Sequence, residues 1–264
     1  MIFNWEIFFR YIWPPTAFQN PLIASGFRAT IEISLGAQAL GIALGLVFAL
    51  AQMSKLRIFR IIAKIYVTYF RGTPALVQLS LIYFGMAAIG LYRFPDLFIF
   101  GFRFPGIIQA AILGLGVSEG AYMTEIIRAG ILSVHPAQME AAKSLGMTYG
   151  LAMRRIVLPQ AIRVIIPPTG NEFNNMFKAT TLTVNIGAVE LFNAFEQINA
   201  VLFRPFELFL AASVYYLVLT ILWGFIQSWL EVRFGDKSSI PKQPGLLRRF
   251  FGVGGKDITP HVVR

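Results

Sequence analysis

Cysteine is absent from this chain of 264 residues, and histidine occurs only twice. Without cysteine, the chain can form no disulfide, thiol nucleophile or cysteine metal site. The two histidines, His135 and His261, lie far apart in the sequence and belong to no His-Glu-x-x-His pattern. We therefore expect neither a metal centre nor a cofactor on this chain.

Charged residues are also scarce. They make up 14% of the chain, whereas soluble domains carry about 25%. Hydrophobic residues make up 56%, and the mean hydropathy is +0.64. The apolar residues fall in runs of about 20, which is the helical length that spans a bilayer. The composition predicts an all-α, polytopic membrane bundle with no large soluble domain.

The first residues lack the early basic region of a signal peptide, and Arg10 and Pro14-Pro15 interrupt their apolar run. Their many aromatic residues suit a helix that lies along the membrane surface. We therefore divide the chain into an interfacial segment (1–20), a transmembrane domain (21–232) and a basic cytoplasmic tail (233–264). The first true span is expected to direct insertion and to stay in the mature protein.

Five membrane-spanning helices can be drawn within the transmembrane domain. Their approximate ranges are 26–52, 65–91, 105–127, 162–188 and 206–230. The first and third contain the small-residue pairs Gly41/Gly45 and Gly116/Gly120. Small residues spaced by four let helices approach closely in lipid, either within one chain or between chains.

Acidic residues are few, so the net charge is +10. Sixteen Lys and Arg fall in the segments after spans one, three and five, and five fall on the opposite side, with Arg71 and Lys178 assigned to neither. The positive-inside rule then places the N-terminus outside and the C-terminus in the cytoplasm. This distribution favours a topology signal and contact with the lipid bilayer over nucleic-acid binding.

One cytoplasmic segment, residues 136–160, is polar enough to stand apart from the spans. Pro136 suits a first helical position, Ala141 and Ala142 favour a helix, and Gly146 suits a left-handed cap. A second helix is expected over 148–157, with Pro159 ending or kinking it. A helix this short is marginal alone in water, so we expect it to dock on a partner; a plain connector is the alternative.

This segment resembles the permease subunits of ABC importers, which carry a cytoplasmic EAA loop. The family pattern is EAA, three residues, Gly, nine residues and I-x-L-P. The chain matches it with Glu140-Ala141-Ala142, Gly146 and Ile156-Val157-Leu158-Pro159. The resemblance covers about residues 20 to 230.

Further motifs are similar to the polar amino acid branch of that family. They are Arg71-Gly72-Thr73-Pro74 with Gln78, Gly120-Ala121-Tyr122 with Glu125 and Arg128, and Gly130-Ile131. The chain departs from the branch at Ala137-Gln138, where Gly-Gln is common. It also departs at Lys178-Ala179-Thr180-Thr181-Leu182, where Lys-Asp-Thr-Ser-Leu is common.

The resemblance implies a coupling helix that fits a groove on a separate ATP-binding cassette subunit. The residues implied in this contact are Glu140, Ala141, Ala142, Lys143, Gly146 and Arg154. It also implies a second permease subunit, an amino acid-binding protein outside the membrane, and a bacterial cytoplasmic (inner) membrane location. The chain itself lacks a Walker A motif, since Gly252–Asp257 has neither the glycine spacing nor the Ser/Thr after Lys. ATP and Mg are therefore expected on the partner, and this chain is expected not to be an enzyme.

Ionisable residues inside the spans are candidates for the substrate pathway, because burying them in lipid is costly. Glu172 is the first candidate: it follows Pro167-Pro168, where we expect a broken helix that lines a cavity. Its carboxylate could bind an ammonium group, or it could pair internally with Lys178 or an arginine. Further candidates are Asn171, Thr180, Thr181 and Glu119.

The function predicted is transmembrane permease for a polar or charged amino acid, driven by ATP. The alternatives are a secondary amino acid transporter or a channel subunit that ATP does not drive. Inverted repeats would favour the first alternative, and a ring of pore charges the second; neither is evident in the sequence. A membrane enzyme would need convergent acid, base and nucleophile residues, and these are not evident either.

Overall fold

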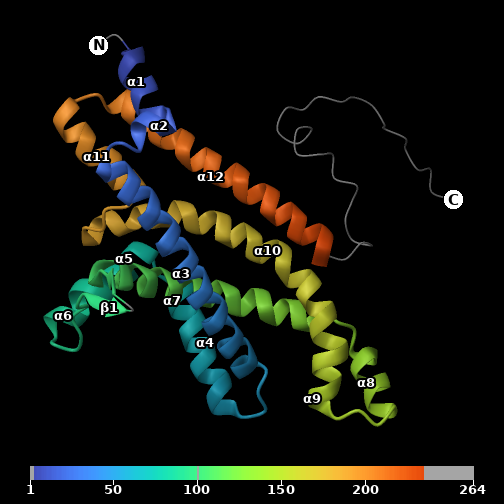
Figure 1. The fold of residues 1–264 in the computed structure, drawn as a ribbon. Helices are drawn as coiled ribbons and strands as arrows, with labels where there is room; N and C mark the ends of the chain where they lie inside the picture. Colours follow the sequence, from blue (N-terminus) through green and yellow to red (C-terminus); the bar gives the residue numbers. More distant parts are fainter. Residues whose placement is uncertain (1–2, 100, 235–264) are drawn as a thin grey trace, which may run out of the picture.

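The computed structural model describes residues 3–99 and 101–234, and Figure 1 shows their arrangement. These residues are almost entirely helical. The α-helices are α1 (Trp5–Ile12), α2 (Pro14–Ala17), α3 (Pro21–Gln52), α4 (Arg57–Gly72), α5 (Ala75–Ser80), α6 (Met86–Ala88), α7 (Gly106–Leu132), α8 (Pro136–Ser144), α9 (Tyr149–Ala152), α10 (Leu158–Ala179), α11 (Leu191–Leu202) and α12 (Pro205–Phe234). Two π-helical turns, η1 (Leu81–Gly85) and η2 (Met153–Val157), and a 3-10 segment, η3 (Thr180–Ile186), join some of them.

A small β-hairpin is the exception to the expected all-α fold. It pairs β1 (Leu97–Ile99) with β2 (Phe102–Phe104) in antiparallel register. Asp96 precedes the hairpin and accepts hydrogen bonds from the Gly106 N–H at 2.8 Å and from Arg103 at 2.6 Å. The bond from Gly106, and then the Arg103 guanidinium, lower the pKa of the Asp96 carboxyl below its ordinary value. The hairpin is therefore tied to the start of α7.

Three helices among the described residues are long and apolar enough to cross a membrane, namely α3, α7 and α12. They match the first, third and fifth predicted spans. The second predicted span is divided, because α4 ends at Gly72 and a shorter apolar helix runs over Ala75–Ala88. The fourth falls on α10 and η3. The count of five spans and the orientation of the termini remain predictions.

Helices α3 and α7 pack closely along their small residues. A side chain added at Gly41 would meet Glu119, and one added at Gly45 would meet the main chain of Met123 at 2.9 Å. Gly116 faces Leu40 in the same way. The residue numbers rise together along both helices, so α3 and α7 run parallel. Both small-residue pairs thus serve packing within the chain.

Helix α10 contradicts the predicted break at Pro167-Pro168, because it continues through both prolines. Proline removes a backbone donor and normally kinks a helix. Here α12 packs along α10 and bonds to its carbonyls: Trp223 donates to Gly170 O at 2.8 Å and Gln227 to Pro167 O at 3.4 Å. These bonds fasten α12 to α10; the carbonyls that Pro167 and Pro168 leave without a helix partner are those of Arg163 and Val164, four residues earlier.

Of the two outcomes predicted at Pro159, an end or a kink of the preceding helix, the structure shows no end. The chain stays helical from α9 through η2 into α10, where Pro159 occupies the first turn. Pro159 has no backbone N–H to donate, and the chain directly before it is a π-helical turn instead of a regular α-helix. The change of direction occurs around η2 (Figure 1).

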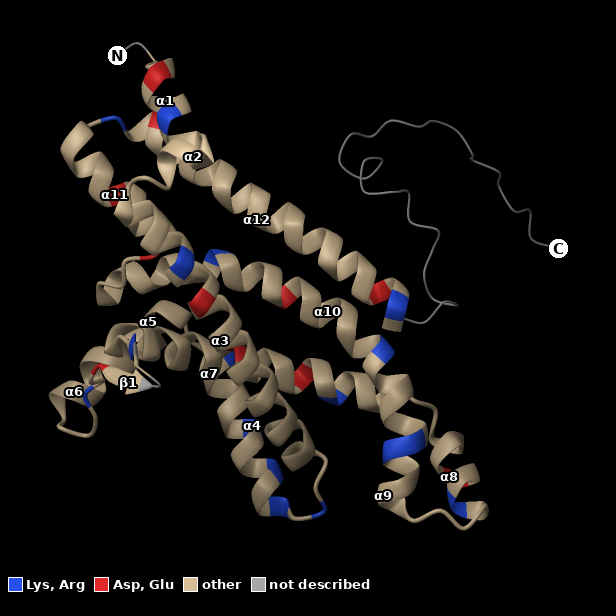
Figure 2. Cartoon of the chain, in the orientation of Figure 1, with Lys and Arg blue, Asp and Glu red and all other residues tan. Residues whose placement is uncertain are grey.

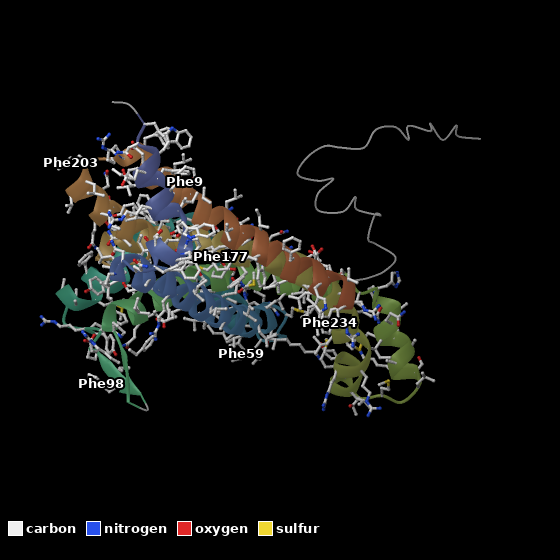
Figure 3. The ribbon with its side chains drawn as sticks, turned by 45° about the horizontal axis from the view of Figure 1, so that its top comes forward. Phe9, Phe59, Phe98, Phe177, Phe203 and Phe234 are labelled. Carbon is white, nitrogen blue, oxygen red and sulfur yellow. The ribbon has the colours of Figure 1, made fainter. Side chains whose placement is uncertain are left out.

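Helix α1 caps the assembly at the N-terminal end. The Asn4 side chain accepts from Ile7 N, and Asn4 N donates to Glu207 on α12 at 2.8 Å. Trp5, Phe9 and Trp13 remain exposed. Figure 3 shows the same contrast across the molecule: Phe177 lies within the packed helices, whereas Phe98 and Phe203 lie at the outside.

Candidate functional site

The cytoplasmic segment predicted to dock forms a well-defined helix, α8. Pro136 is its first residue, and the His135 ring accepts a hydrogen bond from Ala137 N. Gly146 has a φ of 78°, and the N–H groups of Gly146 and Met147 close the last turn on Lys143 O and Ala142 O. This is the glycine-terminated helix end that the sequence predicts.

The two faces of α8 differ. Ala142 is buried, and Met139 packs on the apolar cluster that contains Val157 and Ala161. The other predicted coupling residues face outward: Glu140, Ala141, Lys143, Gly146 and, on η2, Arg154. Helices α8 and α9 project together from one end of the molecule (Figures 1 and 2). The outward face is thus open to a partner, while Ala142 holds the helix to its own chain.

Two apolar side chains on this projection were missed in the sequence. Leu145 is 82% exposed and Tyr149 is 60% exposed, on either side of Gly146. Large exposed apolar groups beside polar ones are typical of interaction surfaces. Their position beside Gly146, a residue expected at the end of a helix, was the available signal in the sequence. We call Glu140, Ala141, Lys143, Leu145, Gly146, Tyr149 and Arg154 the coupling surface.

In the helical core, the structure brings together two of the predicted pathway residues. Glu119 on α7 is 6% exposed, and one of its carboxylate oxygens has no hydrogen-bond partner. Glu172 is half-buried on α10, which packs on α7. Among the described residues, Glu172 takes part in none of the ion pairs, so a pair with Lys178 or an arginine stays a prediction.

The other three predicted pathway residues lie in different surroundings. Asn171 accepts a hydrogen bond from Gln227 on α12 at 3.2 Å. Thr180 is fully buried and donates to Phe177 O, and Thr181 donates to Lys178 O. Neither threonine hydroxyl is left free to donate, so the acidic pair is the stronger part of the candidate pathway.

Two polar neighbours of this acidic pair were not predicted. Gln38 on α3 is 5% exposed, contacts Met123, and has an amide oxygen without a partner. Tyr66 on α4 donates to Val117 O at 2.7 Å and lies near Glu119. A lone glutamine in an apolar span was the available signal for Gln38. Helices α3, α4, α7 and α10 therefore all contribute polar groups near Glu119.

A second buried carboxylate, Glu190, belongs to the framework. It caps α11 by accepting from Phe192 N and Asn193 N, and Tyr216 donates to it at 2.6 Å. Thr30 on α3 accepts from Leu191 N beside it. These bonds join α3, α11 and α12 and leave the carboxylate fully partnered.

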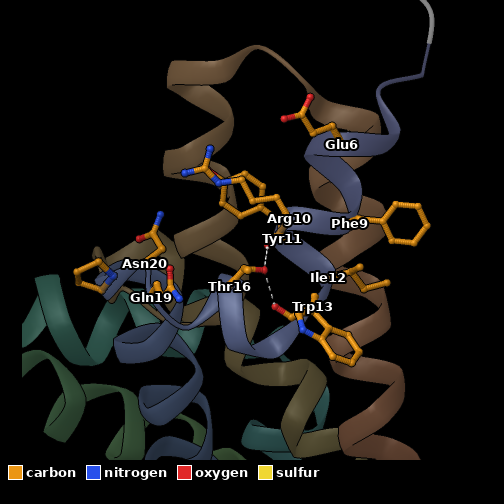
Figure 4. A pocket seen from close by; sticks show the side chains of 10 residues that line it. Glu6, Phe9, Arg10, Tyr11, Ile12, Trp13, Thr16, Gln19 and Asn20 are labelled. Carbon is orange, nitrogen blue, oxygen red and sulfur yellow. Dashed lines mark hydrogen bonds between the residues drawn. The ribbon is translucent and has the colours of Figure 1, made fainter.

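A surface pocket lies elsewhere, on the N-terminal segment (Figure 4). It has a volume of about 1060 Å³ and is lined by residues of the range 6–21, among them Arg10, Trp13 and Thr16. The Thr16 hydroxyl donates to Arg10 O at 2.7 Å, so its proton is already used in a hydrogen bond within the N-terminal segment. None of the predicted pathway residues reaches this pocket, so we do not assign the substrate to it. The part of the chain that the structure describes also holds no cluster of residues able to bind a metal ion.

Comparisons with known proteins agree with these features. Residues 41–236 match the family described as binding-protein-dependent transport system inner membrane component, and the chain belongs to this family. It is thus a membrane permease subunit. The chain is 37% identical to the arginine transport system permease protein ArgU of Corynebacterium glutamicum, over 90% of this chain and 74% of that protein. It is 34% identical to the glutamine transport system permease protein GlnP of Escherichia coli, over 88% of this chain and 98% of that protein.

A solved structure supports the same relationship. The crystal structure of an amino acid ABC transporter with histidines superposes with a TM-score of 0.73 at 35% identity. The match covers 88% of this chain and all of the other. The methionine transporter MetNI in an inward-facing conformation has a TM-score of 0.66 at 18% identity, which shows a shared fold.

Proposed function

We propose that this chain forms the translocation pathway of an ATP-driven importer for a polar or charged amino acid. A binding protein outside the membrane delivers the amino acid, and separate ATP-binding cassette subunits bind ATP and Mg and hydrolyse the ATP. Two permease subunits, either two copies of this chain or this chain with a paralogue, enclose the pathway. The complex resides in the bacterial cytoplasmic membrane.

The observation that carries this proposal is the coupling surface. A short helix, held to its own chain by Ala142 and Met139, projects small, charged and apolar groups away from the bundle. Helix α9, which follows α8 after the turn at Gly146, continues through η2 into α10, the helix that carries Glu172. A movement imposed on α8 and α9 would therefore reach the candidate pathway through connected helices.

The amino acid substrate is supported by the relatives and by the acidic pair. The relatives are named as arginine and glutamine permeases. Glu119 and Glu172 offer carboxylates inside the bundle, where an ammonium or guanidinium group would be held by charge-assisted hydrogen bonds. A carboxylate kept in this setting without a counter-ion is costly unless a ligand uses it.

The five-span topology is part of the proposal. The parallel packing of α3 and α7 requires an odd number of crossings between them, which fits α4 and the helix over Ala75–Ala88 as one broken span. The start of α4 and the α8–α9 projection carry Lys and Arg at the same end of the molecule (Figure 2). This end is then the cytoplasmic one.

The function is tested by uptake into proteoliposomes that hold the complete complex with its binding protein. Accumulation of an amino acid that requires both ATP inside the vesicles and the binding protein outside is the expected result. Uptake that persists without ATP would instead identify a secondary transporter or a channel.

Glu172→Gln tests the pathway within the same assay. We expect the variant to assemble normally but to reduce uptake by roughly tenfold, because it removes a charge-assisted contact. Glu32→Gln is the matched control, since Glu32 pairs with Arg28 at 2.6 Å outside this cluster. Unchanged uptake by Glu172→Gln would dismiss the role of Glu172.

A further inference from the structure

Helix α1 presents three different faces. Its inward face carries partly buried apolar residues between Ile7 and Ile12, which pack on the apolar cluster formed by α3, α11 and α12. A second face carries Trp5, Phe9 and Trp13, which are spaced by four residues and are each more than half exposed. The third face carries two charged and exposed residues, Glu6 and Arg10. In Figure 4, Glu6 and Arg10 point to one side of α1 and Phe9 points to the other.

Hydrogen bonds hold these faces in place at both ends of α1. Asn4 N donates to Glu207 at 2.8 Å, and the Tyr215 hydroxyl donates to Ile12 O at 3.3 Å. Both partners lie in the first half of α12. The exposed faces of α1 are therefore fixed relative to the helical bundle, unlike a chain terminus that nothing ties down.

Trp5, Phe9 and Trp13 form an aromatic stripe along α1. The Trp5 and Phe9 rings stack with their centres 5.8 Å apart. Exposed apolar groups gathered in this way mark an interaction surface, and tryptophan is typical of the boundary between membrane and water. Helix α1 lies at the end of the molecule opposite α8 and α9 (Figure 1), which is the outer end in the proposed topology. We expect the aromatic stripe to contact lipid there.

Glu6 and Arg10 are one helical turn apart, where opposite charges commonly pair. Among the described residues, neither belongs to any of the four ion pairs. The Arg10 guanidinium instead lies 5.9 Å from the centre of the Tyr11 ring. Both charged residues line the surface pocket of about 1060 Å³, together with Phe9 and Trp13 of the aromatic stripe. The pocket therefore offers a cation, an anion and aromatic rings to a single ligand.

A ligand that uses all of these groups needs a negative group, a positive group and an apolar part. Inorganic phosphate would suit Arg10 but would be repelled by Glu6. A free amino acid carries both charges but would leave the aromatic stripe uncovered. We propose that the pocket binds a phospholipid whose headgroup carries a phosphate and a primary ammonium group, as in phosphatidylethanolamine.

Each group of the pocket has a partner on this lipid. The planar fork of Arg10 donates to the phosphate. The Glu6 carboxylate accepts from the ammonium N–H groups, and Phe9 and Trp13 contact the first carbons of the acyl chains. A trimethylated ammonium would lose the N–H donors, and an uncharged headgroup alcohol would lose the positive charge as well. The site is thus selective for a primary ammonium, and it does not depend on which solute the complex transports.

Lipid binding to the purified complex of permease and ATPase subunits, in a non-ionic detergent, tests this site. The probes are phosphatidylethanolamine, phosphatidylcholine and phosphatidylglycerol with identical acyl chains. Native mass spectrometry counts the bound lipids over a range of lipid concentrations. Wild type should bind phosphatidylethanolamine about tenfold more tightly than phosphatidylglycerol, the value of one charge-assisted contact, with phosphatidylcholine between them.

Two variants separate the roles of the charges. Glu6→Gln should bring the ratio of phosphatidylethanolamine to phosphatidylglycerol binding close to one, because it removes the partner of the ammonium. Arg10→Gln should weaken binding of all three lipids about tenfold. Arg10→Lys should recover part of this loss, because it keeps the charge and loses the fork.

Glu196→Gln and Arg93→Gln are the matched controls, since both residues are exposed and lie outside the pocket. Both should bind the lipids as wild type does. The unfolding temperature of each variant without added lipid shows that it is folded.

Equal binding of the three lipids by wild type would overturn the proposal, and so would a wild-type preference in Glu6→Gln or wild-type binding in Arg10→Gln. Displacement of phosphatidylethanolamine by L-arginine or L-glutamine would assign the pocket to an amino acid instead. Weaker docking of the binding protein in both variants, with unchanged lipid binding, would assign it to that protein.

Discussion

Glycines lie in two regions of this molecule and do opposite things there. On α3, residues of α7 occupy the space beside Gly41 and Gly45. A side chain added at either glycine would meet Glu119 or Met123. On the α8–α9 projection, Gly146 and Gly150 have nothing within 4 Å of an added Cβ. The glycines of α3 are packed against another helix of the same chain. The glycines of the α8–α9 projection leave room for a partner protein. Five substitutions, one of them a control, would break or sharpen this contrast.

The largest effect is expected from Gly45→Val. The new side chain would meet the Met123 main chain, which cannot move aside without separating α3 from α7. We expect a loss of about 3 kcal/mol in the free energy of unfolding, typical of overpacking against backbone. Thermal unfolding of the purified protein in detergent measures it.

Gly36→Ala is the matched control on the same helix. Its Cβ would meet the end of the Ile112 side chain, which can turn away. It should cost clearly less than Gly45→Val. Equal unfolding temperatures for wild type and Gly45→Val would show that the α3–α7 contact is not tight.

Gly146→Leu should act on coupling instead of folding of the bundle. A φ of 78° is unfavourable for leucine by about 1–2 kcal/mol, so the end of α8 would shift. We expect normal insertion, retained ATP hydrolysis, and uptake per ATP reduced by roughly tenfold. Paired measurements of hydrolysis and uptake in proteoliposomes check this, and normal coupling would remove Gly146 from the coupling surface.

Gly150→Ala should have a small and opposite effect. Gly150 lies within α9 and is exposed, so alanine meets no obstacle and lowers the entropy of the unfolded chain. We expect local stabilisation of about 0.5–1 kcal/mol, measured as slower amide hydrogen exchange over 149–152. Faster exchange there would mean that α9 needs the freedom of glycine.

The smallest effect on the unfolding temperature is expected from Asp96→Ala. The Asp96 carboxylate accepts a hydrogen bond from the N–H of Gly106, another packed glycine. Because the folded pKa of Asp96 is lowered, its stabilising contribution is complete above the ordinary value of 3.8 and is lost as the pH falls through the lower folded pKa. Wild type and Asp96→Ala should therefore differ in unfolding temperature at pH 6, and the difference should shrink below pH 4. A difference that stays constant down to pH 3 would contradict this.

Much of the coupling region was predictable because its signals are local. Pro136 at the first helical position and Gly146 at the left-handed cap depend on backbone preferences within a single helix. The inward orientation of Ala142 depends on the packing of α8 against η2 and α9, which the sequence of α8 does not contain.

The helical core was less predictable for the same reason. The pattern Pro167-Pro168 predicts a break by local rules, yet α10 continues through both prolines and packs against α12 through Trp223 and Gln227. Conversely, the interruption of the second predicted span at Thr73-Pro74 follows local chemistry, with Gln78 as its cap. Glu119 and Glu172 were each identifiable as costly charges, but their proximity depends on the packing of α7 on α10.

The parallel pairing of α3 and α7 has a consequence for biosynthesis. Neighbouring helices that run in the same direction cannot be joined by a short turn, so the whole stretch 53–105 must be made and placed before the pair can close. At about 5–20 residues per second, Met123 emerges several seconds after Gly45. During that interval the face of α3 that carries Gly41 and Gly45 is not yet covered by α7. The insertion machinery, or a lipid, must occupy this face until the partner helix arrives.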